Sequence, residues 1–161
     1  MNDEELIILY LHGWQSVPGG VKPSYLRAQG ATVIEPALPA DDFDAALAIA
    51  EAARRDNPPD LIVGSSRGGA LAMNMESGDL PLVLLAPAWK RWGSVDRVKP
   101  GTRVLHAEAD DVIAFADSLE LVANSGLDSD ALIRTGSEHR LADPVSLERL
   151  RQAVQAAVHG V

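Results

Sequence analysis

The chain has 161 residues, of which 23 are acidic and 14 are basic, and its formal net charge is −9. This balance argues against a nucleic-acid partner or an anionic membrane surface, because both require clustered Lys and Arg. Cysteine is absent, which excludes disulfides, thiolate metal sites and a cysteine nucleophile. The length predicts one domain over residues 1–161, with a core of its own and no separate substrate domain.

The amino-terminal residues 1–5 are acidic overall and lead directly into the apolar run 6–11. This arrangement is typical of neither a signal peptide nor a membrane span, so we expect a cytoplasmic protein. A continuous apolar run indicates a strand covered on both faces, as in a parallel sheet between two layers of helices. The run ends at His12-Gly13-Trp14, and a loop rich in Gly and Pro follows.

Apolar runs that predict strands alternate along the chain with segments that predict helices. The predicted strands are 6–11, 32–34, 61–63, 82–85, 102–106 and 131–134. The predicted helices lie around 25–28, at 42–55, from Ser66 to about Ser77-Gly78, at 112–123, and from Pro144 onward with Asp143 as N-cap. No two strands are joined tightly enough for a hairpin, so all six are expected to be parallel. The predicted fold is a three-layer α/β sandwich, with a six-stranded, mostly parallel sheet and helices on both faces.

The third predicted strand is followed by a motif of the kind found at catalytic sites. Residues 64–68, Gly-Ser-Ser-Arg-Gly, fit G-x-S-x-G, the strand-to-helix turn that presents a serine hydroxyl above a sheet. An apolar strand precedes the motif and a helical run follows it, which is the context the motif requires. Such a turn strains the serine backbone and needs glycine on both sides. The N–H groups at the start of the next helix face the same point, so a nucleophile and an anion-stabilising donor coincide, as acyl transfer requires.

Further candidates for chemistry follow other predicted strands, and the carboxyl ends of parallel strands share one edge of a sheet. They are His12, the acids around Asp110-Asp111, and His139. A serine hydroxyl needs a base to take its proton, and the base works best when a carboxylate orients it. The chain order of serine, acid and histidine is that of α/β-hydrolases.

The sequence resembles the α/β-hydrolase superfamily over nearly its full length, and more closely the small, lid-less bacterial esterases of the YqiA type. In those proteins a strand ending in His-Gly-aromatic is followed by Gly-Ser-Ser-x-Gly-Gly, and His12-Gly13-Trp14 and residues 64–69 match this pattern. The resemblance implies a serine esterase or related hydrolase that acts on ester bonds and needs no cofactor or metal. Its partner would be a small-molecule ester or thioester.

The resemblance also implies roles for single residues. It implies Ser66 as nucleophile, His139 as base, Asp110 as acid, and the backbone N–H groups of Trp14 and Arg67 as the oxyanion hole. Asp111 stays open as an alternative acid, although the spacing to the apolar residues that follow fits the family better with Asp110.

Several residues near the predicted site have two interpretations. Trp89 and Trp92 lie on the short connection between the fourth and fifth strands. With Trp14 they either form an apolar substrate wall or pack against the edge of the core. Arg67 stands where the family more usually has an uncharged residue, and its guanidinium either binds an acidic substrate or pairs with a carboxylate on the helix surface. We expect His12 to hold the oxyanion loop through a local hydrogen bond.

Two other functions compete with hydrolysis. His106, Glu108 and Asp110 alternate, and on a continuing strand they would share a face and could bind a divalent metal. This interpretation is disfavoured because the strand is expected to end near His106. The second alternative is a non-catalytic protein-binding module with the same fold and turn. Within hydrolases, esterase, thioesterase and peptidase activities all fit the sequence.

Overall fold

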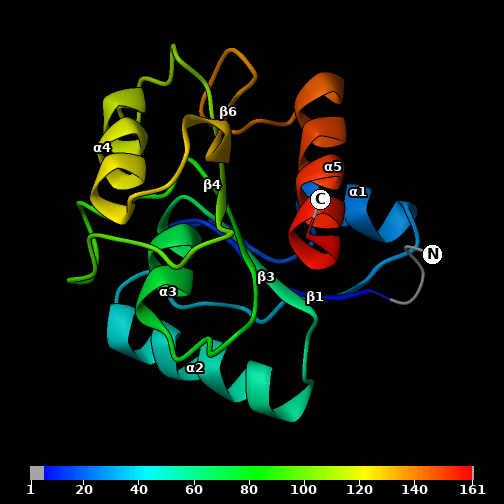
Figure 1. Ribbon diagram of the computed structural model, residues 1–161. Coiled ribbons are helices and arrows are strands. Elements are labelled where there is room, and N and C mark those ends of the chain that lie inside the picture. Colours follow the sequence, from blue (N-terminus) through cyan, green and yellow to red (C-terminus); the bar gives the residue numbers. More distant parts are fainter. Residues whose placement is uncertain (1–5, 161) are drawn as a thin grey trace.

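A six-stranded sheet forms the centre of the computed structural model, which describes residues 6–160 (Figure 1). The strands are β1 (Ile7–Leu11), β2 (Thr32–Ile34), β3 (Leu61–Ser65), β4 (Leu82–Leu85), β5 (Arg103–His106) and β6 (Leu132–Arg134). Their order in the sheet is β2-β1-β3-β4-β5-β6, and every neighbouring pair is parallel. The register pairs Leu11 with Gly64 and Ser65 with Leu85, so the carboxyl ends of β1, β3 and β4 lie at one edge.

Helices cover both faces of this sheet (Figure 1). They are α1 (Val21–Ala28), α2 (Phe43–Asp56), α3 (Arg67–Asn74), α4 (Phe115–Ser125) and α5 (Pro144–His159), with the short 3₁₀ helix η2 (Ser129–Ala131) before β6. The helices α1 and α5 pack on one face, where Leu26 and Leu150 join the core. The helices α2, α3 and α4 pack on the other face through residues such as Ala46, Leu71 and Leu121. The predicted three-layer sandwich is confirmed.

The strand residues explain why both faces are buried. Along β1, Ile8 and Tyr10 belong to the core under α1 and α5, whereas Leu9 and Leu11 belong to the core under α2, α3 and α4. Alternate side chains of a strand point to opposite faces, so a strand between two helical layers has to be apolar throughout. This is the physical origin of the unbroken apolar run at the start of the sequence.

Two helices of the second layer have other bounds than the sequence predicts. Helix α4 begins at Phe115 and not at residue 112, because Asp110 accepts hydrogen bonds from the N–H groups of Val112 and Ile113 and holds a turn there. Helix α3 ends at Asn74, well before Ser77-Gly78, because Met75 turns to an extended conformation with its side chain in the core. No helix within residues 6–160 combines the length and apolar character needed to cross a membrane.

Helix α5 begins where the sequence predicts. Asp143 is its N-cap and accepts a hydrogen bond of 3.1 Å from the N–H of Ser146, and Pro144 is its first residue. The preceding β6–α5 loop carries His139. The start of α5 is therefore fixed directly after the loop that supplies the predicted base.

Candidate active site

The β3–α3 turn places Ser66 at the carboxyl edge of the sheet. Ser66 has φ 58° and ψ −115°, in the left-handed half of backbone space that residues with a side chain seldom adopt. The turn brings neighbouring backbones close together. A Cβ at Gly64 would overlap the carbonyl oxygen of Gly68, and a Cβ at Gly68 would overlap that of Leu11. Glycine is thus a steric requirement at both flanking positions of the motif.

Backbone hydrogen bonds hold Ser66 in this conformation. Its N–H donates to the carbonyl oxygen of Leu85 at 2.8 Å, and its own carbonyl oxygen accepts from the N–H groups of Gly69 and Ala88, both at 2.9 Å. Strain of about 1–3 kcal/mol persists only where the surroundings over-determine the backbone. Contacts from β4, from the loop after β4 and from α3 provide that restraint.

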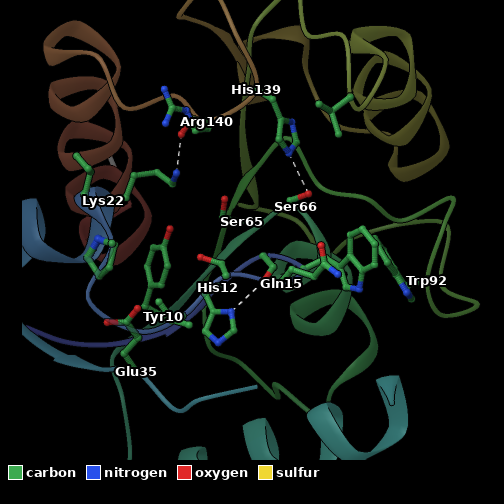
Figure 2. A pocket seen from close by; sticks show the side chains of 18 of the residues that line it. Tyr10, His12, Gln15, Lys22, Glu35, Ser65, Ser66, Trp92, His139 and Arg140 are labelled. Carbon is green, nitrogen blue, oxygen red and sulfur yellow. Dashed lines mark hydrogen bonds between the residues drawn. The ribbon is translucent and has the colours of Figure 1, made fainter. Parts of the chain in front are cut away.

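Three side chains from different strand ends meet above the sheet, and Figure 2 shows two of them, Ser66 and His139, with the contact between them. The Oγ of Ser66 lies 3.1 Å from Nε2 of His139, and Nδ1 of His139 lies 2.7 Å from Oδ2 of Asp110. With the proton of the neutral imidazole on Nδ1, His139 donates to Asp110 and its Nε2 can accept the Ser66 hydroxyl proton. The structure thus brings together Ser66, Asp110 and His139.

The acid of this cluster is buried and fully hydrogen-bonded. The Asp110 side chain is 0% exposed, and its Oδ1 accepts from the N–H groups of Val112 and Ile113, both at 2.8 Å. Burial by itself would raise the pKa of Asp110, but the hydrogen bonds from His139, Ile113 and Val112 outweigh it, and the pKa lies below its ordinary value. Asp111 is exposed. Of the two candidate acids, Asp110 is the one that touches His139.

A second histidine contacts the same carboxylate. His106, at the end of β5, is 0% exposed, and its Nε2 lies 3.2 Å from Oδ2 of Asp110 and 2.9 Å from the carbonyl oxygen of Ile113. Its Nδ1 is 2.7 Å from Oγ of Ser118. Burial lowers the pKa of His106, although Ile113 and Asp110 partly oppose the shift, so the neutral form is favoured. In the sequence, only the alternation of His106 and Asp110 indicates that these two side chains lie close together.

The alternating residues His106, Glu108 and Asp110 do not form a metal site. The strand β5 ends at His106, and Glu108 is exposed while His106 and Asp110 are buried. Residues 6–160 contain no group of three or more His, Cys, Asp or Glu side chains placed to hold a metal ion.

Two backbone N–H groups in the segments next to Ser66 have no hydrogen-bond partner within residues 6–160. Arg67 is the first residue of α3, where helical N–H groups have no partner within the helix, and neither its N–H nor that of Trp14 donates a hydrogen bond within residues 6–160. The loop after β1 lies against the turn, because a Cβ on Gly13 would be 3.5 Å from Cβ of Ser66. His12 fixes that loop, with Nδ1 at 2.9 Å from the Gly13 carbonyl oxygen and Nε2 at 3.0 Å from the N–H of Leu38.

A cavity of about 400 Å³ opens in front of Ser66 and His139. Figure 2 shows Trp92 on one side of Ser66 and Tyr10, Lys22 and Glu35 on the other. Trp14 and Trp92 both line the cavity, and their ring centroids lie 6.2 Å apart. The cavity therefore has an aromatic end, formed by Trp14 and Trp92, and a polar end, formed by Tyr10, Lys22 and Glu35.

The expectation that Trp89 belongs to the cavity wall is wrong. Trp89 is 7% exposed, packs in the core under α2, α3 and α4, and donates from Nε1 to the carbonyl oxygen of Asp117 at 3.0 Å. The hydrogen bond to α4 holds its ring in the core and away from the cavity. Of the two tryptophans on the β4–β5 connection, only Trp92 lines the cavity.

The expectation that Arg67 pairs with a carboxylate on the helix surface is also wrong. Arg67 is 1% exposed, and its guanidinium carbon lies 5.6 Å from the ring centroids of both Phe43 and Trp92. None of its guanidinium nitrogens has a hydrogen-bond partner within residues 6–160. Burial lowers the pKa of Arg67, while Asp41 and Asp42 oppose the shift. The side chain lies behind Trp92 and does not line the cavity, so it is not placed to bind an acidic substrate either.

The sheet order and the helical layers give the chain the fold of the α/β-hydrolase superfamily. The structure of alpha/beta hydrolase domain-containing protein 10 from mouse is similar, with a TM-score of 0.75 and 14% identity over 96% of this chain and 90% of that one. A protein described as a hydrolase of the alpha/beta superfamily, from Xanthomonas campestris pv. campestris, has a TM-score of 0.71 and 19% identity over 98% of this chain and 100% of that one. Est1E from Butyrivibrio proteoclasticus has a TM-score of 0.71 and 13% identity over 96% of this chain and 88% of that one.

No protein-family model and no curated protein matches the sequence. At these identities the similarity to solved structures establishes the fold alone. The narrower resemblance to YqiA-type esterases stays a prediction.

Proposed function

We propose that this protein is a serine hydrolase that cleaves a small ester or thioester. His139 takes the proton of the Ser66 hydroxyl as Oγ attacks the acyl carbon, and Asp110 orients His139 and balances the positive charge that forms on it. The tetrahedral intermediate then collapses to an acyl-enzyme as His139 gives the proton to the leaving group. Water deacylates the enzyme by the same sequence of proton transfers.

The oxyanion of both tetrahedral intermediates would be bound by the N–H groups of Arg67 and Trp14. Neither amide has a hydrogen-bond partner in residues 6–160, Arg67 directly follows Ser66, and Trp14 follows Gly13, which lies against Ser66. Preorganised N–H donors at the oxyanion are among the strongest contributors to acyl transfer. The open cavity admits a small substrate directly to the hydroxyl. The observation that carries the proposal is the continuous hydrogen-bonded chain from Ser66 through His139 to Asp110.

A labelling and activity experiment tests this proposal. A fluorophosphonate probe should label the wild type at Ser66, and Ser66→Ala should lose labelling and reduce hydrolysis of a short-chain p-nitrophenyl ester by at least about 10³-fold. Ser94→Ala, which changes an exposed serine outside the cavity, is the matched control and should react as the wild type does. Circular dichroism should show both variants folded. A folded Ser66→Ala with substantial activity would remove the assignment and favour a binding module of the same fold.

A further inference from the structure

We infer that the substrate carries an anionic group, which binds Lys22 at the polar end of the cavity while the apolar part of the molecule lies at the aromatic end. This inference rests on the proposed hydrolase function. It concerns the chemistry of the substrate and not the reaction at Ser66. The argument begins with the charges that line the cavity and with the partners each of them already has.

Four charged side chains line the cavity: Lys22, Glu35, Arg91 and Arg140. Glu35 has a counter-charge, because its Oε1 lies 3.3 Å from Nη1 of Arg27 and also accepts from the N–H of Gly19 at 2.9 Å, whereas its Oε2 is buried without a hydrogen-bond partner within residues 6–160. Arg140 is also paired, since its Nε lies 3.2 Å from Oε1 of Glu138. These two charges are therefore neutralised locally.

Lys22 and Arg91 are the cations left over. Neither forms an ion pair with a carboxylate among residues 6–160, and both donate to carbonyl oxygens instead. Nζ of Lys22 donates to the carbonyl oxygen of Arg140 at 2.5 Å, and Nη2 of Arg91 donates to that of Val112 at 2.5 Å. The cavity thus has an excess of positive charge in a chain whose net charge is −9. A concave site of one sign raises the local concentration of ligands of the opposite sign.

Lys22 is the better placed of the two to bind an anion. Its ammonium group lies in the cavity wall together with Tyr10 and Ser65, and Figure 2 shows it directed toward the carbonyl oxygen of Arg140. Burial lowers the pKa of Lys22 to about 8, although Glu138 opposes the shift and Arg140 adds to it. A half-buried ammonium that has no carboxylate partner gains from an anion delivered by a ligand. Arg91 is exposed and keeps more of its hydration.

The two ends of the cavity then define the shape of the substrate. The scissile carbonyl lies at Ser66, between the Trp14 and Trp92 rings on one side and Lys22 on the other. The compound recognised is an ester or thioester with an apolar group on one side of the bond and an anionic group on the other. Carboxylate and phosphate both offer the charge and the acceptor oxygens that Lys22 requires.

Matched esters test this inference. The substrates are p-nitrophenyl esters whose acyl chain ends in a carboxylate, in the corresponding methyl ester, or in a phosphate. We expect the wild type to prefer the better of the two anionic esters to the neutral one by about tenfold or more in kcat/KM, and the preference to shrink as ionic strength rises. Which anion is preferred identifies the source of the charge.

Variants assign the preference to one side chain. Lys22→Met should remove most of the preference for the anionic ester over the neutral one, through a higher KM for the anionic ester, and Lys22→Arg should restore part of it. Lys90→Met is the matched control, because Lys90 pairs with Asp117 and Glu120 away from the cavity, and it should keep the full preference.

Three results overturn the inference. The first is a wild type that cleaves the neutral ester as well as either anionic one. The second is loss of the preference in Arg91→Met but not in Lys22→Met, which would place the anion elsewhere. In both cases Ser66 would still be labelled and esters would still be cleaved, so the hydrolase assignment would survive. The third is absence of both labelling and hydrolysis, and this removes the proposed function and the inference together.

Discussion

The two sides of His139 differ in how completely their hydrogen bonds are satisfied. On the Asp110 side, both carboxylate oxygens are buried, and they contact His139, His106 and the N–H groups of Val112 and Ile113. On the Ser66 side, the hydroxyl borders an open cavity, and neither the N–H of Trp14 nor that of Arg67 has a partner in residues 6–160.

Under the proposed function, this difference would let one site combine a rigid base with groups free to bind substrate. A base has to be held in one orientation and one tautomer before substrate arrives, so the acid that holds it is saturated with protein contacts. The groups that stabilise a transition state have to be free until the substrate supplies the charge. Substitutions on the two sides of His139 are therefore expected to fail in different ways.

Asp110→Asn tests the Asp110 side of His139, where the hydrogen bonds are satisfied within the protein, and it has the largest expected effect in this comparison. The amide oxygen can still accept from Val112 and Ile113, which leaves the NH₂ group facing His139. An NH₂ group donates to Nδ1 and favours the wrong tautomer, so we expect kcat to fall by about 10⁴-fold with little change in KM. Steady-state kinetics with a p-nitrophenyl ester measures this.

Asp111→Asn is the matched control for that substitution. Asp111 is the adjacent, exposed carboxylate, and its removal should change kcat by less than about twofold. If Asp111→Asn lost activity and Asp110→Asn kept it, the acid would be the other residue and the comparison of the two sides would fail.

The fold could be predicted from the sequence because its determinants are local. Each of the six strands contains consecutive apolar residues, and the absence of short strand-to-strand connections favours parallel pairing. The start of α5 is equally local, since Asp143 and Pro144 are the N-cap and first residue. The start of α4 was misplaced because Asp110 takes up the N–H groups of Val112 and Ile113, which the apolar spacing does not reveal.

The cluster of Ser66, Asp110 and His139 was predicted by motif, chain order and strand-end position together, and those signals locate residues only to an edge of the sheet. The surroundings of the cluster depend on contacts between distant segments. Arg67 is buried because Phe43 of α2 and Trp92 of the β4–β5 connection close over it. Which tryptophan reaches the cavity is likewise decided by the path of that connection, and the sequence cannot separate Trp89 from Trp92.

His106→Gln tests the Asp110 side of His139 in a second way, because it removes one contact of Asp110 and keeps the carboxylate itself. His106 contacts Asp110, Ile113 and Ser118 but no part of the cavity wall, so its loss should affect the orientation of Asp110 and leave substrate binding alone. We expect kcat to fall by about tenfold with KM unchanged. A parallel rise in KM would show instead that His106 supports the substrate side.

The same variant should change how stability depends on pH. Burial lowers the pKa of His106 below its ordinary value of 6.5, so the unfolded chain binds a proton that the folded chain rejects as pH falls below about 6.5. This group therefore makes the free energy of unfolding fall from about pH 6.5 down to the lowered pKa. Urea titrations at pH 8, 6.5 and 5 should show a shallower decline for His106→Gln than for the wild type. Equal slopes would mean that His106 is not the buried neutral group described.

Trp92→Ala tests the Ser66 side of His139, which borders the cavity, and it has the smallest expected effect. Trp92 contributes an apolar wall to the cavity, and it contacts none of the groups that exchange protons. Such a wall binds ground state and transition state about equally, so its loss should raise KM for an aryl ester about three- to tenfold and change kcat by less than about threefold.

Trp89→Phe provides the aromatic control for that variant, because Trp89 packs in the core and donates to Asp117 outside the cavity. It should lower the free energy of unfolding by about 1–3 kcal/mol and leave KM unchanged. If Trp92→Ala instead lowered kcat as strongly as a change at Asp110, the cation–aromatic contact between Arg67 and Trp92 would be implicated in placing the Arg67 N–H. The aromatic wall would then belong to the rigid part of the site, and the division of the site at His139 would no longer hold.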